Sequence, residues 1–228
     1  MYDQFADDYA RHSENSPANR YYDRPAILAL AGDVAGQRVL ELGCAAGALS
    51  EQLVDRGADL HGLDREPRMV QLATDRLGNR ARFDVADLGE PLSMVESDSV
   101  DLVVASLVLH YLKDWSRPLE ELHRCLAPGG SLVMSVHHPA ADWEWAGFPE
   151  YLTTTQIHDT WRLGDRSVQV SYYRRPLSEV FGQLHNAGFT VDHLVEPRPL
   201  PELRDIDPRA FEELNTKPAF LHLRARTA

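Results

Sequence analysis

Short apolar segments alternate along the chain with segments whose apolar residues recur at helical spacing. The apolar segments lie at residues 38–42, 58–63, 81–85, 100–105 and 131–136, and helical spacing follows at 48–57, 66–77 and 116–126. The segment 100–105 is almost wholly apolar, as in a parallel strand that is covered on both faces. This alternation predicts an α/β fold with a doubly wound, mostly parallel sheet. Its ligand crevice is expected at the carboxyl ends of the strands.

Two segments depart from this alternation. Residues 1–35 have helical spacing and are rich in aromatic side chains, among them Tyr2, Phe5, Tyr9, Tyr21 and Tyr22. Residues 137–175 hold three of the four tryptophans, and the runs 157–163 and 168–173 predict a hairpin that turns around residues 164–165. A helix at 177–187, a strand at 189–195, a proline-rich loop and a strand at 220–226 are expected to close the chain.

Composition narrows the class of protein. The 228 residues are 43% hydrophobic and carry a formal net charge of -12, which disfavours nucleic acid as a partner. The longest run of apolar or small residues, 102–109, is too short to cross a membrane, and the acidic N-terminal residues lack the apolar region of a secretory signal. Cys44 and Cys125 lie far apart in the sequence. A single domain in the reducing cytoplasm is expected, without a disulfide framework.

The first apolar strand ends in the pattern Glu41-x-Gly43-x-Ala45-x-Gly47. Small residues let a ligand approach the backbone, and the helix that follows offers free N–H groups to it. The spacing fits neither the dinucleotide fingerprint nor the phosphate loop, and an acid at Glu41 would repel a pyrophosphate. The pattern resembles motif I of the class I S-adenosylmethionine (SAM) dependent methyltransferases, in which the acid lies near the methionine end of SAM. Ala45 departs from that motif, which most often has Gly there.

The resemblance implies further SAM-binding residues. Asp64 ends the second strand and is expected to accept the ribose hydroxyls, although it could instead cap the next helix. After the third strand, Asp87 is expected to receive the adenine amino group and the backbone N–H of Leu88 to meet the ring. Tyr9 is expected in an N-terminal lid over the cofactor. The remaining candidates for SAM binding are Cys44, Arg65 and Met69.

Residues 106–111 follow the fourth strand and read Ser-Leu-Val-Leu-His-Tyr. Methyltransferases that act on DNA bases or protein amides usually have Asn/Asp-Pro-Pro-Tyr/Phe at this position, so the segment is similar to that of small-molecule methyltransferases. Ser106 is then expected to line the methionine part of SAM. His110 either faces the substrate or is a structural histidine in the core.

His137 and His138 end the fifth strand, and Pro139 follows. Adjacent residues that leave a strand point to opposite sides, so the two histidines are not expected to share one metal ion, and no metal site is predicted. His138, beside the proline, is expected to face the substrate, with His137 as the second choice, and the alternative is a solvent-exposed or capping histidine. If the acceptor is a hydroxyl, His138 or His110 is the candidate general base. Arg174 and Arg175 are expected to be surface charges or to hold an anionic group of the substrate.

The sequence therefore predicts a SAM-dependent methyltransferase with a seven-stranded sheet whose last strand is antiparallel. The expected parts are a helical lid (1–35), a cofactor-binding core (36–136), a substrate cap inserted after strand five (137–175) and closing elements (176–228). The expected acceptor is a small molecule, apolar, aromatic or cationic, attacked at O, N or C, with S-adenosylhomocysteine (SAH) as the other product. A SAM-binding protein without methyl transfer and, less favoured, a nicotinamide oxidoreductase are the alternatives. The oligomeric state is not predicted.

Overall fold

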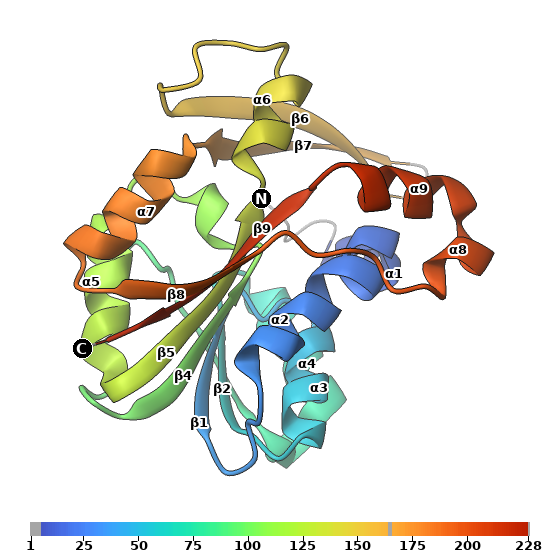
Figure 1. Cartoon of the computed structure of the whole chain (residues 1–228). Coiled ribbons are helices and arrows are strands. Elements are labelled where there is room, and N and C mark those ends of the chain that lie inside the picture. Colours follow the sequence, from blue (N-terminus) through green and yellow to red (C-terminus); the bar gives the residue numbers. More distant parts are fainter. Residues whose placement is uncertain (1–5, 164–165, 228) are drawn as a thin grey trace.

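A seven-stranded sheet and a separate hairpin make up the β-structure of the computed structural model, which describes residues 6–163 and 166–227 (Figure 1). The strand order of the large sheet is β3-β2-β1-β4-β5-β9-β8. Its strands are β1 (Arg38–Leu42), β2 (Asp59–Asp64), β3 (Arg82–Val85), β4 (Val100–Ser106), β5 (Leu126–His137), β8 (Thr190–Val195) and β9 (Phe220–Arg226). Strands β1 to β5 pair in parallel, whereas β9 is antiparallel to both β5 and β8. This confirms the predicted mostly parallel sheet with an antiparallel last strand.

The sheet has an apolar core on each face. One face packs against α5 (Ser116–Cys125) and α7 (Leu177–Asn186), and the other against α2 (Arg24–Ala31) and α3 (Ala48–Asp55). Helix α4 (Pro67–Leu77) lies beside α3 (Figure 1). The strand order reverses at β1, because β2 and β3 follow on one side of it and β4 and β5 on the other, all in parallel. At such a switch point the loops diverge and leave room for a ligand at the carboxyl ends of the strands.

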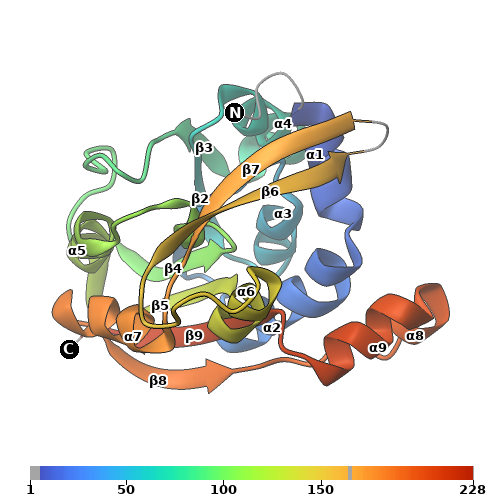
Figure 2. The ribbon, with the colours of Figure 1, turned by 90° about the horizontal axis from the view of Figure 1, so that it is seen from above.

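Two elements cover this carboxyl end. The hairpin of β6 (Thr155–Leu163) and β7 (Arg166–Arg174) extends over it, as seen from above in Figure 2. The N-terminal segment, formed by α1 (Ala6–Asn15), the π-helix η1 (Asn19–Asp23) and α2, lies beside it, and α1 contacts β6. The expected residues Tyr2 and Phe5 of the lid, and the turn at 164–165, lie outside the described residues.

Several short elements were not predicted from the hydrophobic pattern. They are the 3-10 turns η2 (Gly78–Arg80) and η3 (Leu109–Tyr111), and the helices α6 (Pro139–Trp145), α8 (Leu203–Ile206) and α9 (Pro208–Thr216). Helices α6 and α9 each begin at a proline, which is favourable in the first turn, and the side chains of His138 and Asp207 cap them. Helices this short have too few turns to give a clear apolar periodicity.

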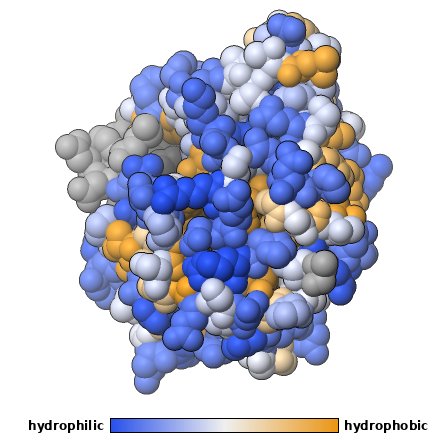
Figure 3. All heavy atoms as spheres, turned by 90° about the vertical axis from the view of Figure 1, so that its left-hand side faces the viewer, coloured by the Kyte–Doolittle hydropathy of each residue, from blue (hydrophilic) through white to orange (hydrophobic). Residues whose placement is uncertain are grey.

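The outer surfaces of α5 and α7 are mainly polar. In Figure 3, which faces that side of the molecule, hydrophilic residues dominate and apolar residues occur in scattered patches. Helix α5 accordingly buries Pro118, Leu119, Leu122 and Cys125 on its inner face. Within the described part of the chain, every helix is too short or too polar to cross a membrane.

Candidate cofactor and substrate site

A cavity of about 730 Å³ lies at the carboxyl ends of β1, β2, β3 and β4. This is within the range of sites that enclose a small molecule. Residues of the N-terminal segment, of η3 and of the β6–β7 hairpin complete its walls. Eleven of the twelve predicted SAM-binding residues line it, namely Tyr9, Glu41, Gly43, Cys44, Ala45, Asp64, Arg65, Met69, Asp87, Leu88 and Ser106. Their roles toward a cofactor stay predictions, but the fold does bring them together around one space.

Gly47 is the predicted residue that is not part of the cavity wall. It has φ +80°, and a Cβ placed on it would lie 3.1 Å from Leu77 and 3.3 Å from Ala73 of α4. Glycine is needed here for a left-handed backbone and for close packing of the α3 start against α4. The parts of the motif that border the cavity are therefore Glu41 and Gly43 to Ala46. Ala45 has φ 46°, a conformation that favours glycine, which explains why a Gly suits this position better.

Glu41 is a buried carboxyl at the end of β1 that faces the cavity. Its side chain accepts a hydrogen bond from Ser50 Oγ at 2.5 Å, and the residue is 2% exposed. Burial raises the pKa of Glu41 to about 8, and the nearby charge of Asp64 acts in the same direction. A cationic group placed in the cavity would favour ionised Glu41, because it would replace the lost hydration.

Asp64 orders the turn beside it. Its Oδ2 accepts from the backbone N–H of Ala45 at 3.0 Å, and its Oδ1 from that of Glu66 at 2.9 Å. The alternative role as a cap of α4 is not seen, since the residue at that cap is Glu66. Burial raises the pKa of Asp64, while these two backbone donors oppose the rise. Each carboxylate oxygen can accept a second hydrogen bond, so a ligand diol can still bind there.

The N-terminal segment and the hairpin meet across the top of the cavity. The rings of Tyr9 and Trp161 are stacked with centroids 6.4 Å apart and an angle of 7° between their planes, and both line the cavity. On the opposite side, Asp87 follows β3 and its Oδ1 accepts from Gly89 N at 2.9 Å. The cavity is thus bounded by acids at the strand ends and by aromatic rings on its cover.

A buried polar network that the sequence did not reveal supports the floor of the cavity. Asp23 of η1 accepts from Ser106 Oγ at 2.6 Å, and its other oxygen lies 2.9 Å from His222 Nε2. Asp23 is 1% and His222 0% exposed, and Asp23 lines the cavity together with Ser106. The signal that could have revealed Asp23 is an acid among aromatic residues in a buried helical segment. Its partners, however, lie too far along the chain to be read from spacing.

The three predicted histidines occupy different environments. His110 and His137 line the cavity, and their rings are stacked with centroids 4.2 Å apart. The choice of His138 over His137 as the histidine that faces the substrate is not supported, because His138 is not part of the cavity wall. Its Nδ1 accepts from Ala140 N at 3.2 Å and its Nε2 lies 2.9 Å from Glu196. The chain leaves β5 at His137 and turns into α6, which directs the next side chain to the helix start.

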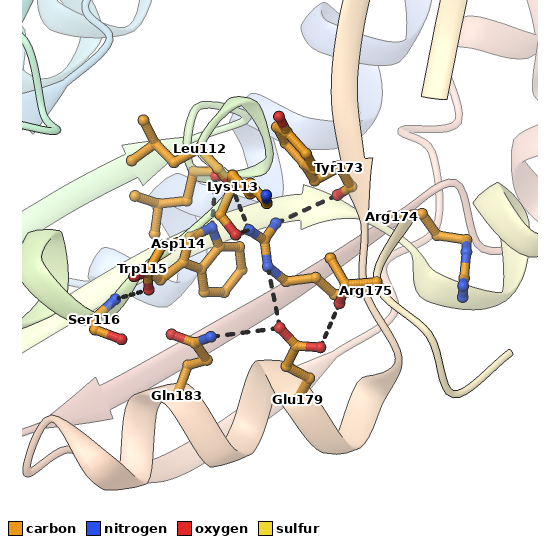
Figure 4. Close-up of polar contacts among 12 residues, drawn as sticks. Leu112, Lys113, Asp114, Trp115, Ser116, Tyr173, Arg174, Arg175, Glu179 and Gln183 are labelled. Atoms are coloured by element: carbon orange, nitrogen blue, oxygen red, sulfur yellow. Dashed lines mark hydrogen bonds and ion pairs between the residues drawn. The ribbon is translucent and has the colours of Figure 1, made fainter. Parts of the chain in front are cut away.

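Arg174 and Arg175 are buried rather than exposed, and neither lines the cavity. Figure 4 shows the Arg175 guanidinium directed at the carbonyl groups of Leu112 and Lys113, with Arg174 pointing elsewhere. Arg175 also lies over the Trp115 ring, 4.5 Å from its centroid. The expectation of a surface charge is therefore wrong. Arg175 instead links the loop after η3 to the end of the hairpin by donating hydrogen bonds to the carbonyl groups of Lys113 and Tyr173 (Figure 4).

Comparisons with known proteins agree with this geometry. Residues 40–134 match the methyltransferase domain family. The crystal structure of a SAM-dependent methyltransferase from Mesorhizobium loti is similar, with a TM-score of 0.71 and 25% identity, over 93% of this chain and 99% of that one. An uncharacterized methyltransferase of Geobacillus kaustophilus is 29% identical over 59% of this chain and 64% of its own. The ubiquinone biosynthesis O-methyltransferase of Xanthomonas oryzae is 32% identical over 45% of this chain and 44% of its own.

The chain therefore spans less than two thirds of the length of those two curated relatives. The matched residues contain most of β1, all of β2 to β4 and most of β5, and β1 to β4 supply the strand ends around the cavity. Residues 40–134 thus form a methyltransferase domain, and the chain has the class I, Rossmann-like fold of SAM-dependent methyltransferases. SAM is accordingly its cofactor, and the residues present fit it, since buried Glu41 can pair with an ammonium group and Asp64 can accept ribose hydroxyls.

Proposed function

We propose that the protein transfers a methyl group from SAM to a small aromatic acceptor held in the same cavity. The main support for this proposal is that the cavity wall has two parts of different chemistry. Acids at the strand ends line one part, while the part formed by η3, the hairpin and the ends of β5 and β9 is aromatic and neutral. The residues of this second part are His110, Tyr111, Leu112, His137, Gln156, Thr160, Trp161, Ser171, Tyr173 and Phe220.

The strand-end part suits SAM. We assign Glu41 to the amino group of its methionine portion, Asp64 to the ribose hydroxyls, and Asp87 with Leu88 to the adenine. Ser106 lies at the methionine portion and Tyr9 covers the cofactor. The buried state of Glu41 supports the first assignment, because a carboxyl whose pKa is about 8 in the free protein gains most from a cationic partner.

The aromatic part suits the acceptor. Its described lining residues carry no Asp, Glu, Lys or Arg, so a strongly charged acceptor would find no ionic partner among them. Aromatic rings instead offer stacking surfaces, and the hydroxyl and amide groups of Thr160, Ser171 and Gln156 offer neutral hydrogen bonds. A cationic acceptor held over a ring face by cation–π contact is the alternative for this part.

SAM, when bound, supplies a methyl group already activated by the positive sulfur. The chain is then required mainly to hold the acceptor in line and to exclude water, and such alignment is the main source of rate in reactions of this kind. Tyr9 and Trp161 stack across the cavity and so limit the access of water from above. SAH is the expected second product. We further propose a cytoplasmic location, which the two buried free cysteines support.

The test is a transfer assay with SAM labelled in its methyl group and a panel of phenolic, amine and carboxylate acceptors. We expect label to appear in aromatic acceptors and SAH to form in equal amount. Label transferred only to strongly charged aliphatic acceptors would contradict the proposed acceptor class. Tight binding of SAM without transfer to any acceptor of the panel would instead favour a SAM-binding protein with another role.

A further inference from the structure

The last residue of β5 faces a carboxylate that the following helix brings back to it. His137 Nδ1 lies 3.3 Å from Oδ1 of Asp142, which is itself buried and lies outside the cavity wall. Helix α6 starts at Pro139, and Asp142 N donates to His138 O at 3.0 Å, so the first turn of the helix fixes the carboxylate beside the imidazole. A carboxylate near one ring nitrogen favours the tautomer that carries its proton on that nitrogen, which leaves the opposite nitrogen, Nε2, as an acceptor.

Aromatic neighbours fix the plane of the His137 ring. It is stacked on His110 and on Phe220, with centroids 4.2 and 5.7 Å away, and meets the edge of Tyr172 at 4.5 Å. The titratable groups that face it are Asp142 from α6, His110 from η3 and Tyr172 from β7, whose hydroxyl lies 3.5 Å from the same Asp142 oxygen. Burial lowers the pKa of His110 well below its ordinary value, and His137 and Arg175 add to this, so His110 stays neutral at pH 7.

His110 supplies an independent sign that a polar ligand group belongs here. The residue is 2% exposed and lines the cavity, and neither of its ring nitrogens has a hydrogen-bond partner among the described residues. A buried polar group without a partner is costly, so such a group in a cavity wall indicates a missing ligand atom. A neutral imidazole both donates and accepts, and a hydroxyl group does the same, which makes the two complementary.

We propose that Asp142 and His137 form a general-base pair and that the acceptor is an aromatic hydroxyl compound, methylated on oxygen. This rests on the proposed methyl transfer. In the reaction the acceptor oxygen forms its bond to the methyl carbon, the bond from that carbon to sulfur breaks, and its electron pair stays on sulfur. The hydroxyl proton passes to Nε2 of His137. His137 is thus the catalytic residue, His110 binds the hydroxyl, and Asp142 is a positioning residue that acts through His137.

The first test uses the wild-type protein saturated with SAH and 4-nitrophenol as a coloured probe. Below the pKa of the free phenol, the bound probe is expected to show the absorbance of the phenolate, because its proton has moved to His137. The His137→Gln and Asp142→Asn variants should lose this band, and Glu144→Gln should keep it. Glu144 is an exposed carboxylate on the same helix, paired with Lys217, and is thus a matched control.

The second test measures methyl transfer to ring-substituted phenols that range from 4-nitrophenol to 4-methoxyphenol. His137→Gln should lower kcat for weakly acidic phenols by about 10²- to 10⁴-fold, the usual contribution of a general base. For phenols that are already ionised in solution, the same substitution should lower kcat much less. Asp142→Asn should follow the same order with a smaller loss in kcat and little change in KM. A purely structural role would lower the rates of all the phenols equally.

Three outcomes overturn this inference. The first is bound 4-nitrophenol that stays protonated in the wild type, and the second is a phenolate band that survives in Asp142→Asn. The third is transfer to amines but to none of the phenols, which would leave the proposed methyl transfer intact. A different result would contradict the proposed function itself: SAM and SAH would not bind the folded wild-type protein.

Discussion

Asp23 and His222 lie 199 positions apart in the chain, yet Asp23 Oδ1 and His222 Nε2 are 2.9 Å apart in the core beneath the cavity. The pair joins the N-terminal segment to β9, and Ser106 at the end of β4 binds the second oxygen of Asp23. The N-terminal segment is thus attached to the sheet by a buried polar contact, besides the apolar packing of α2 on the same face. A lid that is fixed at one end in this way keeps Tyr9 within reach of the hairpin.

Asp23→Ala removes the partner of two buried groups at once. Since each buried polar group left without a hydrogen-bond partner costs about 1–3 kcal/mol, the free energy of unfolding should fall by about 2–5 kcal/mol. Urea denaturation followed by circular dichroism measures the change. Asp33→Ala is a suitable control, because Asp33 lies just after α2 and is exposed. Equal stability of the Asp23 and Asp33 variants would contradict a structural role for the network.

Glu41→Gln should remove a pH dependence of stability. The folded protein binds the proton of Glu41 up to about pH 8, whereas the ordinary pKa is 4.5, so ionisation of Glu41 destabilises the fold as the pH rises through this range. The variant lacks this loss. Its free energy of unfolding relative to the wild type should therefore increase from pH 4.5 to pH 8, on the order of 1–3 kcal/mol in all. Denaturation curves at several pH values measure it, and a constant difference would contradict burial of the ionisable carboxyl.

The same carboxyl should couple SAM binding to proton release. An ammonium group beside Glu41 favours the ionised form, so SAM binding at pH 6.5 should release a proton from the wild type, and affinity should rise with pH toward 8. Calorimetry in two buffers that differ in ionisation enthalpy reports the number of protons. Glu41→Gln should show weaker binding and the same heat in both buffers. Proton release that persists in the variant would assign it to another group.

Gly43→Ala should be more harmful than Gly36→Ala. Both glycines have positive φ, near +70°, but a Cβ on Gly43 would lie 2.7 Å from Val108, whereas one on Gly36 would meet nothing within 4 Å. The Gly36 variant measures the backbone cost alone, about 1 kcal/mol, and the Gly43 variant should add about 1–3 kcal/mol of overpacking. Thermal unfolding compares them. The Gly43 variant should also weaken SAM binding, because the turn borders the cavity.

Arg175→Lys should loosen the loop that carries part of the acceptor wall. Burial lowers the pKa of Arg175 to about 10, so the group stays charged at pH 7 and bonds the carbonyls of Leu112 and Lys113 (Figure 4). A lysine lacks the fork that reaches both. The free energy of unfolding should fall by about 2 kcal/mol, and the acceptor KM should rise while SAM affinity is unchanged. Arg117→Lys, at an exposed arginine of α5, is the control. A loss confined to SAM affinity would contradict this role.

The sequence predicted the site residues that follow directly from the apolar strands, because the end of a strand fixes their position in the fold. Strands that end in an acid, as at Glu41 and Asp64, could be placed from apolar runs alone, because parallel strands all bring their carboxyl ends to one edge. The histidines could not be ranked this way. His137 and His138 differ in environment because α6 begins at Pro139, and a seven-residue helix leaves little periodicity to detect. The role of Asp23 could not be predicted from the sequence, because its hydrogen-bond partners, Ser106 and His222, come from β4 and β9.

The burial of Arg174 and Arg175 was also beyond the pattern. A pair of arginines before a proline is typical of a surface turn, and only the three-dimensional course of the chain supplies the backbone carbonyls that compensate for burial. The same holds for Gly47, where motif I predicted a contact with the ligand and the structure assigns the glycine to packing against Ala73 and Leu77 of α4. A sequence motif thus predicts where a site lies in the fold, whereas the role of each residue in the motif becomes clear only from the contacts that it makes.

The measurement that tests the central claim most directly is calorimetric titration with SAM, SAH and NAD of the wild type, Asp64→Ala and Asp59→Ala. Asp64 and Asp59 lie at opposite ends of β2, so the second is a control for loss of an acid from the same strand. We predict that SAM and SAH bind the wild type and Asp59→Ala alike, that Asp64→Ala binds them at least about tenfold more weakly, and that NAD does not bind. Binding of NAD alone, or an Asp64 variant that binds SAM as tightly as the wild type, would contradict the account.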